Sequence, residues 1–299
     1  MFGKNPGKLL WCGLVCAVLS ASGSAQTKYT YVYFAAHAKE TGIFVTAINN
    51  AGDVVGLYHT TVGGVTASTG FERLTTGEIV HVVDPDSNDN FDRANGINNK
   101  GEITGDYLND SGGTVIYQGY EHMGGEYITY SVDAGYSTDV YGVNDNGDFV
   151  GLYYDGSIYQ GFVNVADKVT NINYPDAVYT YPDDINNAGQ IVGEYLDSSG
   201  FYHGFLGNSE GKIIGALNYP GAIDTYPGGI NNHGEVVGYY TDSANVTHGF
   251  TFKAGKYTAF NVPKAMDTIA FGINDSGQIV GYVVTPAAVS EGFIATPVE

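Results

Sequence analysis

The stretch "GINNHGEVVGYY" at Gly229–Tyr240 occurs in six versions along the chain and decides the fold. The other versions begin at Ala47, Gly96, Gly142, Asp184 and Gly272. They read "AINNAGDVVGLY", "GINNKGEITGDY", "GVNDNGDFVGLY", "DINNAGQIVGEY" and "GINDSGQIVGYV". Successive versions start 42 to 49 residues apart. A period of that length indicates a repeat array or a propeller.

In each version an asparagine-rich corner and a glycine separate two apolar runs. Asparagine adopts turn geometry and hydrogen-bonds the nearby backbone, and glycine accepts the positive φ that closes a hairpin. We therefore interpret the motif as a structural hairpin and not as a catalytic sequence.

The interior of one repeat, Gly249–Tyr282, contains the four short runs "GFTF", "KYTAFNV", "TIAFGIN" and "QIVGY". Each run is rich in β-branched or aromatic residues and is bounded by Gly, Pro, Asn or Asp, which is typical of strands. No stretch after residue 25 shows sustained helical spacing of apolar residues. The sequence predicts an all-β fold, a six-bladed β-propeller of four-stranded antiparallel blades.

The two ends of the chain supply the parts of one blade. The early segment "TKYTYVYFAA" (Thr27–Ala36) matches "KYTAFNV", and the late segment "GFIATP" (Gly292–Pro297) matches "GFTF". We name the strands of a blade from the axis outward: A ("AFGIN"), B ("QIVGY"), C ("GFTF") and D ("KYTAFNV"). The first D strand then completes the last blade, so pairing of the N- and C-terminal strands closes the ring and leaves few open edges.

Residues 1–25 have the features of a secretory signal peptide. Lys4 and Lys8 precede the apolar run "LLWCGLVCAVLSA", which is too short for an ordinary membrane span. Small residues then lead to a cleavage site after Ala25. We expect a secreted protein, extracellular or periplasmic, with residues 26–299 as one propeller domain. Cys12 and Cys16 both lie in the leader, so the mature chain has no disulfide.

The chain is acidic, with 12 Lys and Arg against 32 Asp and Glu and a net charge of −20. Removing Lys4 and Lys8 with the leader changes this to −22. Such a charge repels nucleic acids and anionic lipid. We expect no nucleic-acid partner, no membrane insertion and a monomer.

The repeats resemble the HAF-type extracellular repeat family, whose pattern is a "GF" strand, a "YPGA" link and "GINNxGqivGyY". That pattern is fullest in "HGFLGNSEGKIIGALNYPGAIDTYPGGINNHGEVVGYY" (His203–Tyr240). The resemblance covers essentially the whole mature chain and implies export and a propeller-like fold, and it carries no catalytic residues. The first position of the family's tripeptide is histidine only at His203 and His248, and it is Thr69, Gln118, Gln160 and Glu291 in the other repeats.

One position near the channel mouth is a candidate ligand-binding site. The D-to-A and B-to-C loops share one face of a propeller. Aligning the D-to-A links on "IN" gives one equivalent position in each repeat: Phe44, Arg93, Asp139, Tyr181, Tyr226 and Ile269. Aromatic faces with polar neighbours suit a sugar or an extended polymer. The alternative is that these rings only plug the channel or pack between blades.

The link "DPDSNDNFDRA" (Asp84–Ala94) differs from the others and gives a weak calcium candidate. Its ligands would be the alternating side chains Asp84, Asp86, Asn88 and Asn90. The pattern lacks the glycine and the final glutamate of a calcium loop, so a solvated acidic loop is the alternative. No other cofactor is predicted. Because His203 and His248 lie on outer strands, we expect them to be too far apart to share a zinc ion. We instead expect hydrogen bonds between blades.

Three functions fit these features. The first is a non-catalytic binding module for an extracellular glycan or surface protein. The second is a hydrolase or lyase that acts on polysaccharides with carboxylates at the channel mouth: Asp92, Asp139, Asp183, Asp224 or Asp267. The third is a passive extracellular matrix or surface repeat protein. No HExxH, GxSxG or Walker sequence occurs. Nothing selects a pair of carboxylates, so we assign no catalytic residue and favour the binding module.

Overall fold

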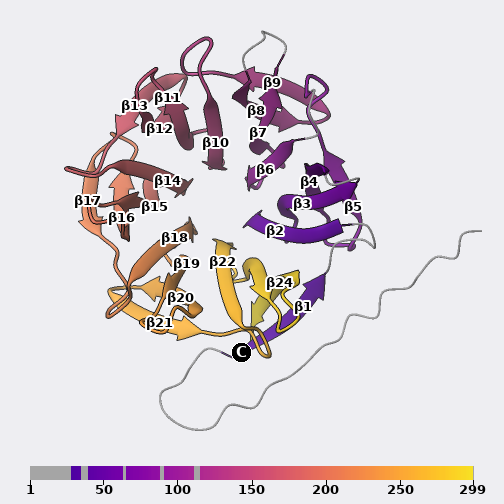
Figure 1. Cartoon of the computed structure of the whole chain (residues 1–299), viewed down its shortest axis with the longest axis vertical. Coiled ribbons are helices and arrows are strands. Elements are labelled where there is room, and N and C mark those ends of the chain that lie inside the picture. The colour runs from indigo at the N-terminus through magenta and orange to yellow at the C-terminus, as the bar shows by residue number, and fades with distance from the viewer. Residues whose placement is uncertain (1–27, 35–39, 63–64, 88–90, 111–114, 299) are drawn as a thin grey trace, which may run out of the picture.

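The computed structural model describes residues 28–34, 40–62, 65–87, 91–110 and 115–298. These residues form strands arranged as six four-stranded antiparallel sheets around a central axis (Figure 1). This confirms the predicted six-bladed β-propeller. Within those ranges no helix is long and apolar enough to cross a membrane. The predicted signal peptide, residues 1–25, lies outside the described part of the chain.

The blades follow one another along the chain, and each runs from the axis outward in the order A, B, C, D (Figure 1). Their strands are β2 (Glu40–Ile48), β3 (Val54–Val62), β4 (Val65–Arg73) and β5 (Ile79–Val82); β6 (Asp92–Ile97), β7 (Ile103–Asn109), β8 (Ile116–Met123) and β9 (Glu126–Tyr130); β10 (Thr138–Val143), β11 (Phe149–Tyr154), β12 (Tyr159–Val165) and β13 (Lys168–Ile172); β14 (Tyr179–Ile185), β15 (Gln190–Leu196), β16 (Tyr202–Asn208) and β17 (Ile213–Ala216); β18 (Asp224–Ile230), β19 (Val236–Thr241), β20 (Thr247–Lys253) and β21 (Lys256–Phe260); and β22 (Asp267–Ile273), β23 (Ile279–Val284), β24 (Ser290–Pro297) and β1 (Tyr29–Phe34).

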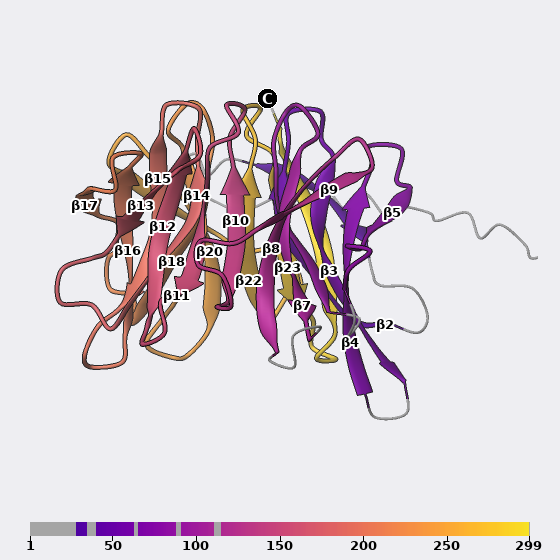
Figure 2. The ribbon, with the colours of Figure 1, turned by 90° about the horizontal axis from the view of Figure 1, so that it is seen from above.

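The last blade is closed by the first strand, as predicted. Strand β1 pairs antiparallel with β24, from Tyr29 opposite Pro297 to Phe34 opposite Gly292. The ring therefore has no break between the two ends of the described chain. Seen edge-on, the blades form a ring with loops on two faces, and the hairpin of β3 and β4 projects beyond its neighbours on the B-to-C face (Figure 2).

The aromatic residue of the "GF" sequence anchors every blade. It is fully buried in all six C strands, as Phe71, Tyr120, Phe162, Phe205, Phe250 and Phe293. Burying one such side chain contributes about 1.5–3 kcal/mol. This repeated burial stabilises the packing of blade on blade without any disulfide.

Every inner strand carries a β-bulge at the same level. The bulged residues are Thr46, Asn95, Tyr141, Asp183, Gly228 and Phe271. A bulge bends a strand and redirects a side chain. It also explains the last glycine of the motif, because a Cβ at Gly193 would overlap the carbonyl oxygen of Tyr181. The same overlap occurs at Gly56, Gly105, Gly151, Gly238 and Gly281.

The first asparagine of each turn is bonded within its own turn, as Asn186 illustrates. Its Oδ1 accepts hydrogen bonds from the backbone N–H groups of Ala188 (3.1 Å) and Gln190 (3.0 Å). The turn glycines have φ between 72° and 92°: Gly52, Gly101, Gly147, Gly189, Gly234 and Gly277. The predicted structural hairpin is therefore confirmed.

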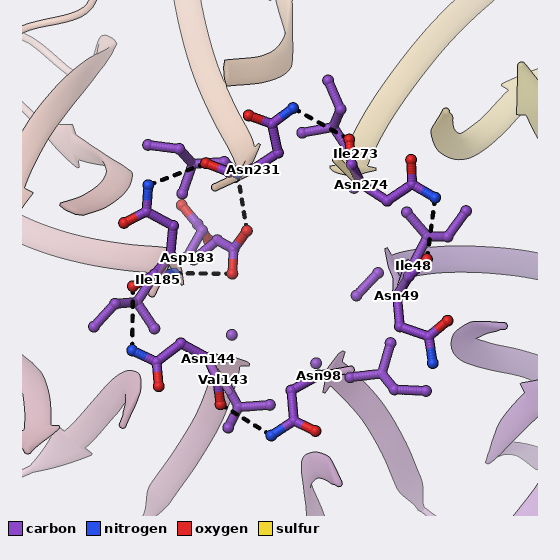
Figure 3. A pocket seen from close by; sticks show the side chains of 18 of the residues that line it. Ile48, Asn49, Asn98, Val143, Asn144, Asp183, Ile185, Asn231, Ile273 and Asn274 are labelled. Atoms are coloured by element: carbon purple, nitrogen blue, oxygen red, sulfur yellow. Dashed lines mark hydrogen bonds between the residues drawn. The ribbon is translucent and has the colours of Figure 1, made fainter. Parts of the chain in front are cut away.

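The same asparagines also join neighbouring blades, which was not predicted. Nδ2 of Asn186 donates to the carbonyl oxygen of Asn231 in the next blade (3.0 Å). Such bonds run around the axis from Asn98 to Asn144, Asn186, Asn231, Asn274 and Asn49 (Figure 3). All six asparagines are at most 6% exposed.

The second residue of each turn forms another ring, nearer to solvent. Each backbone N–H donates to the side-chain oxygen of the next member, through Asn50, Asn99, Asp145, Asn187, Asn232 and Asp275. Asp145 also accepts from Nδ2 of Asn99 (2.9 Å) and of Asn187 (2.7 Å). Burial raises the pKa of Asp145, but these bonds together outweigh it, so the pKa lies below its usual value.

Candidate functional site

The six residues predicted at the channel mouth lie at one level of the inner strands. Each stands opposite a residue of the B strand, such as Tyr181 opposite Glu194, Tyr226 opposite Tyr239 and Ile269 opposite Tyr282. Directly opposed residues project from the same face of a sheet. The channel wall is therefore made by strands A and B together.

These three pairs line one open cavity of about 620 Å³. Tyr202, Thr241, Thr247 and Asp267 complete the lining. Thr241 ends β19 and Thr247 begins β20, so this cavity opens on the face of the B-to-C loops. The structure thus places Tyr181, Tyr226 and Ile269 together in the cavity. Phe44, Arg93 and Asp139 are not among its lining residues.

A second cavity, of about 280 Å³, opens on the face of the asparagine turns. The six bulged residues line it, and so do the six buried asparagines of the turns. Asp183 lies inside that ring (Figure 3). Tyr181 and Glu194 line both cavities, so the two are halves of one channel that meet at this pair.

Seven aromatic side chains form a continuous series along one side of the channel, which we call the aromatic arc. In order, they are Tyr181, Tyr202, Tyr226, Tyr239, Phe271, Tyr282 and Phe44, with successive ring centroids 4.6 to 6.5 Å apart. The rings of Tyr226 and Tyr239 are stacked, with 14° between their planes. Stacked and edge contacts of this kind are favourable aromatic geometries. Each ring is held by its neighbours, so the arc is a preformed wall.

The opposite side of the channel carries a charged cluster around Arg93. Its Nε donates to Asp106 Oδ2 (2.9 Å), and its Nη2 lies 3.3 Å from Asp139 Oδ1. The guanidinium carbon lies over the rings of Phe91 and Tyr117, 5.1 and 5.3 Å from their centroids. Burial raises the pKa of Asp139 to about 7, with a contribution from Asp106, against the opposing charge of Arg93. Arg93 and Asp139 therefore bond to each other across two blades.

Two carboxyl groups meet where the cavities join. The bulge of β14 places Asp183 beside Glu194 of β15, and both residues line the cavity on the asparagine face. Oδ2 of Asp183 is buried and has no hydrogen-bond partner among the described residues. Burial raises the pKa of Glu194 to about 7 and holds the pKa of Asp183 well above its usual value, where the charge of Glu194 adds to the rise. Both carboxyl groups therefore bind a proton more readily than exposed ones do.

The neighbouring Asp184 is structural. It accepts hydrogen bonds from the backbone N–H groups of Ile185 (2.8 Å) and of Ile230 in the next blade (2.9 Å). Burial raises its pKa to about 7, and these bonds partly oppose the rise. Its role is to join two blades beside the carboxyl pair.

Three of the carboxylates proposed for an enzyme accept bonds from loop backbone. Asp92 accepts from the N–H of Asp84 (3.0 Å). The other two are Asp224, which accepts from Tyr202 N–H (2.8 Å), and Asp267, which accepts from Thr247 N–H (3.0 Å). Three of the five candidates, Asp92, Asp139 and Asp183, have a second carboxylate near enough to help raise their pKa, and burial is the larger cause in each.

The calcium candidate stays a prediction. Oδ1 of Asp84 accepts from the backbone N–H of Asp86 (2.8 Å), and Asn88 and Asn90 lie outside the described residues. Oδ2 of Asp84 is buried without a partner in the described structure. Within the described ranges there is no group of three or more His, Cys, Asp and Glu that could hold a metal ion.

The prediction that the two histidines form hydrogen bonds between blades is wrong. Nε2 of His203 lies 3.0 Å from Asp197, and Nε2 of His248 lies 3.1 Å from Asp242. Each aspartate belongs to the turn before the histidine's own strand, in the same blade.

Sequence reasoning missed the B-strand residues of the site: Glu194, Tyr239 and Tyr282. A signal was present, since the residue after the motif's last glycine varies between repeats. It is Leu57, Asp106, Leu152, Glu194, Tyr239 and Tyr282. The register that places these residues opposite the predicted A-strand position is visible only in the structure.

No protein-family model and no curated protein sequence matches the chain. Among solved structures, it is similar to the β-propeller domain of the Trilobed protease from Pyrococcus furiosus, at 9% identity and a TM-score of 0.51, over 85% of this chain and 93% of that one. A mutant of AofleA from Arthrobotrys oligospora matches at 11% identity and 0.50, over 92% and 88%. An Aleuria aurantia lectin mutant in complex with α-methyl-L-fucoside matches at 10% and 0.48, over 88% and 93%. At these identities the likeness shows the fold alone.

Proposed function

We propose that this protein is a secreted, non-catalytic β-propeller binding module that takes an extracellular glycan at the mouth of its channel. The observation that carries the proposal is the aromatic arc beside the open cavity of about 620 Å³. Export rests on the predicted leader of residues 1–25. The cavity volume falls within the range of about 300–1,000 Å³ that is usual for ligand sites.

The chemistry of the lining suits a sugar. A sugar ring presents apolar C–H faces and hydroxyl edges, and aromatic rings contact such faces while keeping a polar atom available. Thr241, Thr247 and Asp267 supply hydrogen-bonding groups at the rim of the same cavity. The wide opening accommodates one end of a longer chain.

The proposal is tested with a glycan array of the protein from residue 26 onward, with and without calcium. The parent is compared with a Tyr181→Ala/Tyr226→Ala double variant and with Tyr136→Ala, which removes an exposed tyrosine outside the cavity. We expect saturable binding that the double variant loses and Tyr136→Ala keeps, with all three proteins folded by circular dichroism. Absence of any glycan binding, or equal binding by the double variant, would contradict the proposal.

One observation favours an enzyme instead: a carboxyl pair with a raised pKa lies at the end of the cavity. Retaining and inverting glycosidases separate their two carboxyl groups by about 5–5.5 and about 6.5–9.5 Å respectively. In this protein Glu194 lines the open cavity and Asp183 lines the other one, so the two carboxyl groups do not flank a sugar bound at the mouth. Binding is therefore the better supported function. Product release from a bound glycan that Glu194→Gln abolishes would favour the enzyme.

A further inference from the structure

We propose that the glycan taken at this mouth carries free amino groups, and that a protonated amine binds beside Glu194 between Tyr181, Tyr226 and Tyr239. This inference rests on the proposed function and names the chemical class of its ligand, an amino saccharide.

The charges in the cavity point to a cationic ligand. Its lining contains the carboxylates Glu194 and Asp267 and no Lys, Arg or His. Arg93, on the other side of the channel, is bonded to Asp106 and Asp139. An acidic sugar would meet like charge, and a neutral sugar would leave the carboxylates without a counter-charge. A ligand ammonium supplies that charge.

The rings around Glu194 add a second attraction. Tyr181 stands directly opposite Glu194, and Tyr226 and Tyr239 line the same cavity with their rings stacked, 4.6 Å between centroids. They come from β14, β18 and β19, so they face Glu194 from two blades. A cation over tyrosine faces is attracted by the ring quadrupole, and proteins recognise ammonium groups with such aromatic cages.

The carboxyl pair offers unused acceptors to an ammonium. Oδ2 of Asp183 is buried and has no hydrogen-bond partner in the described structure, and Asp183 and Glu194 line the same cavity. An ammonium has three N–H donors and no acceptor. Placed against Glu194, it donates to that carboxyl group and lies next to a second acid. Charge-assisted bonds of this kind are stronger than those of neutral groups.

The test is calorimetric titration at pH 7, where Glu194 is about half ionised, and 0.15 M salt with two oligosaccharides of equal length, a β-1,4-glucosamine oligomer and its fully N-acetylated counterpart. We expect the amino oligomer to bind at least about tenfold more tightly. Equal or tighter binding of the acetylated oligomer would overturn this inference and leave the proposed glycan function standing. Absence of binding by both oligomers and by every glycan of the array would overturn both.

Variants separate the local site from the general attraction of a cation to an acidic protein. Glu194→Gln keeps the shape of the side chain and should lose about tenfold in affinity for the amino oligomer. Glu126→Gln removes one exposed carboxylate of the outer strand β9 and should lose almost nothing. Tyr239→Leu should also reduce the preference for the amino oligomer, since it removes one ring of the cage. Equal losses in Glu194→Gln and Glu126→Gln would contradict the site.

Discussion

The two ends of the channel are built from the same strands. At one end the six blades carry the same residue at equivalent positions, and at the other end they carry different residues. At the asparagine end, all six blades present the same buried asparagine, and five of these asparagines donate to the carbonyl group of the next one. At the mouth, the equivalent position is Phe44, Arg93, Asp139, Tyr181, Tyr226 or Ile269. The bulged residues between them also differ in every blade. Repetition marks the positions that close the ring, and variation marks those that face a ligand without six-fold symmetry.

The physical reason lies in what each end must bond to. An asparagine in one turn donates to the same carbonyl group of the next blade at five junctions, so the same side chain serves at each of them. A ligand at the mouth lies against one side of the ring, where the aromatic arc is. On the other side of the ring, the charge of Arg93 is already paired with Asp106 and Asp139.

The largest expected effect is at the repeating end. Asn186→Ala removes four hydrogen bonds, two accepted by Oδ1 within the turn and two donated by Nδ2, to Gln190 and to the carbonyl oxygen of Asn231 in the next blade. We expect the free energy of unfolding to fall by about 2–4 kcal/mol. Chemical denaturation measures it. Asn146→Ala, in an exposed turn position, is the control with little loss. Glycan affinity of the folded Asn186→Ala protein should be unchanged, and a large change in affinity would break the comparison.

The next effect is at the glycine that accommodates the bulge. Gly193→Ala places a Cβ on the carbonyl oxygen of Tyr181 and against the ring of Phe205, so the bulge must shift. We expect a loss of about 1–3 kcal/mol in unfolding free energy and a weaker glycan affinity, because Tyr181 and Glu194 move with it. Gly215→Ala in outer strand β17 meets no atom within 4 Å and is the matched control. If both variants have the same stability, the glycine is not required by the bulge.

The smallest effect is on the pH dependence of stability at the mouth. Burial raises the pKa of Glu194 from 4.5 to about 7, so the folded protein holds a proton that the unfolded chain releases. The stability contributed by this group is full below about pH 4.5 and is lost as the pH rises through 7.

Removing that carboxyl sharpens the comparison between the two ends. The melting temperature of Glu194→Gln, measured relative to the parent by differential scanning calorimetry, should rise steadily from pH 4.5 to pH 8. A difference that is constant with pH, or that falls, would show that Glu194 does not titrate as described. The variant should lose ligand affinity while it keeps its stability, the reverse of Asn186→Ala.

Much of the fold could be predicted from the sequence, because the asparagine and glycine residues that form the turn recur in all six repeats. The period, the four runs per repeat and the matching ends were enough for the blade count and for the closure by β1 and β24. The hydrogen bonds between blades were not predictable. The sequence of a turn motif indicates its own hairpin, but it does not indicate which residues of the next blade lie beside it.

Three of the six residues predicted at the channel mouth, Tyr181, Tyr226 and Ile269, line the open cavity, and their role in binding stays a prediction. They were identified by counting back from the motif in each repeat. Glu194 and its pairing with Asp183 were missed, because a bulge shifts the alternation of side chains and nothing in the sequence marks where it falls. The resemblance to HAF-type repeats, the export signal and the calcium candidate stay predictions.

The measurement that tests the central claim most directly is amide hydrogen exchange of the whole mature protein, with and without a saturating glucosamine oligomer. The account predicts slower exchange in strands β14, β15, β18 and β19 around Glu194, Tyr226 and Tyr239, and no change in the six asparagine turns. Protection centred on those turns, or no protection anywhere, would contradict the assignment of the varied end of the channel as the binding site.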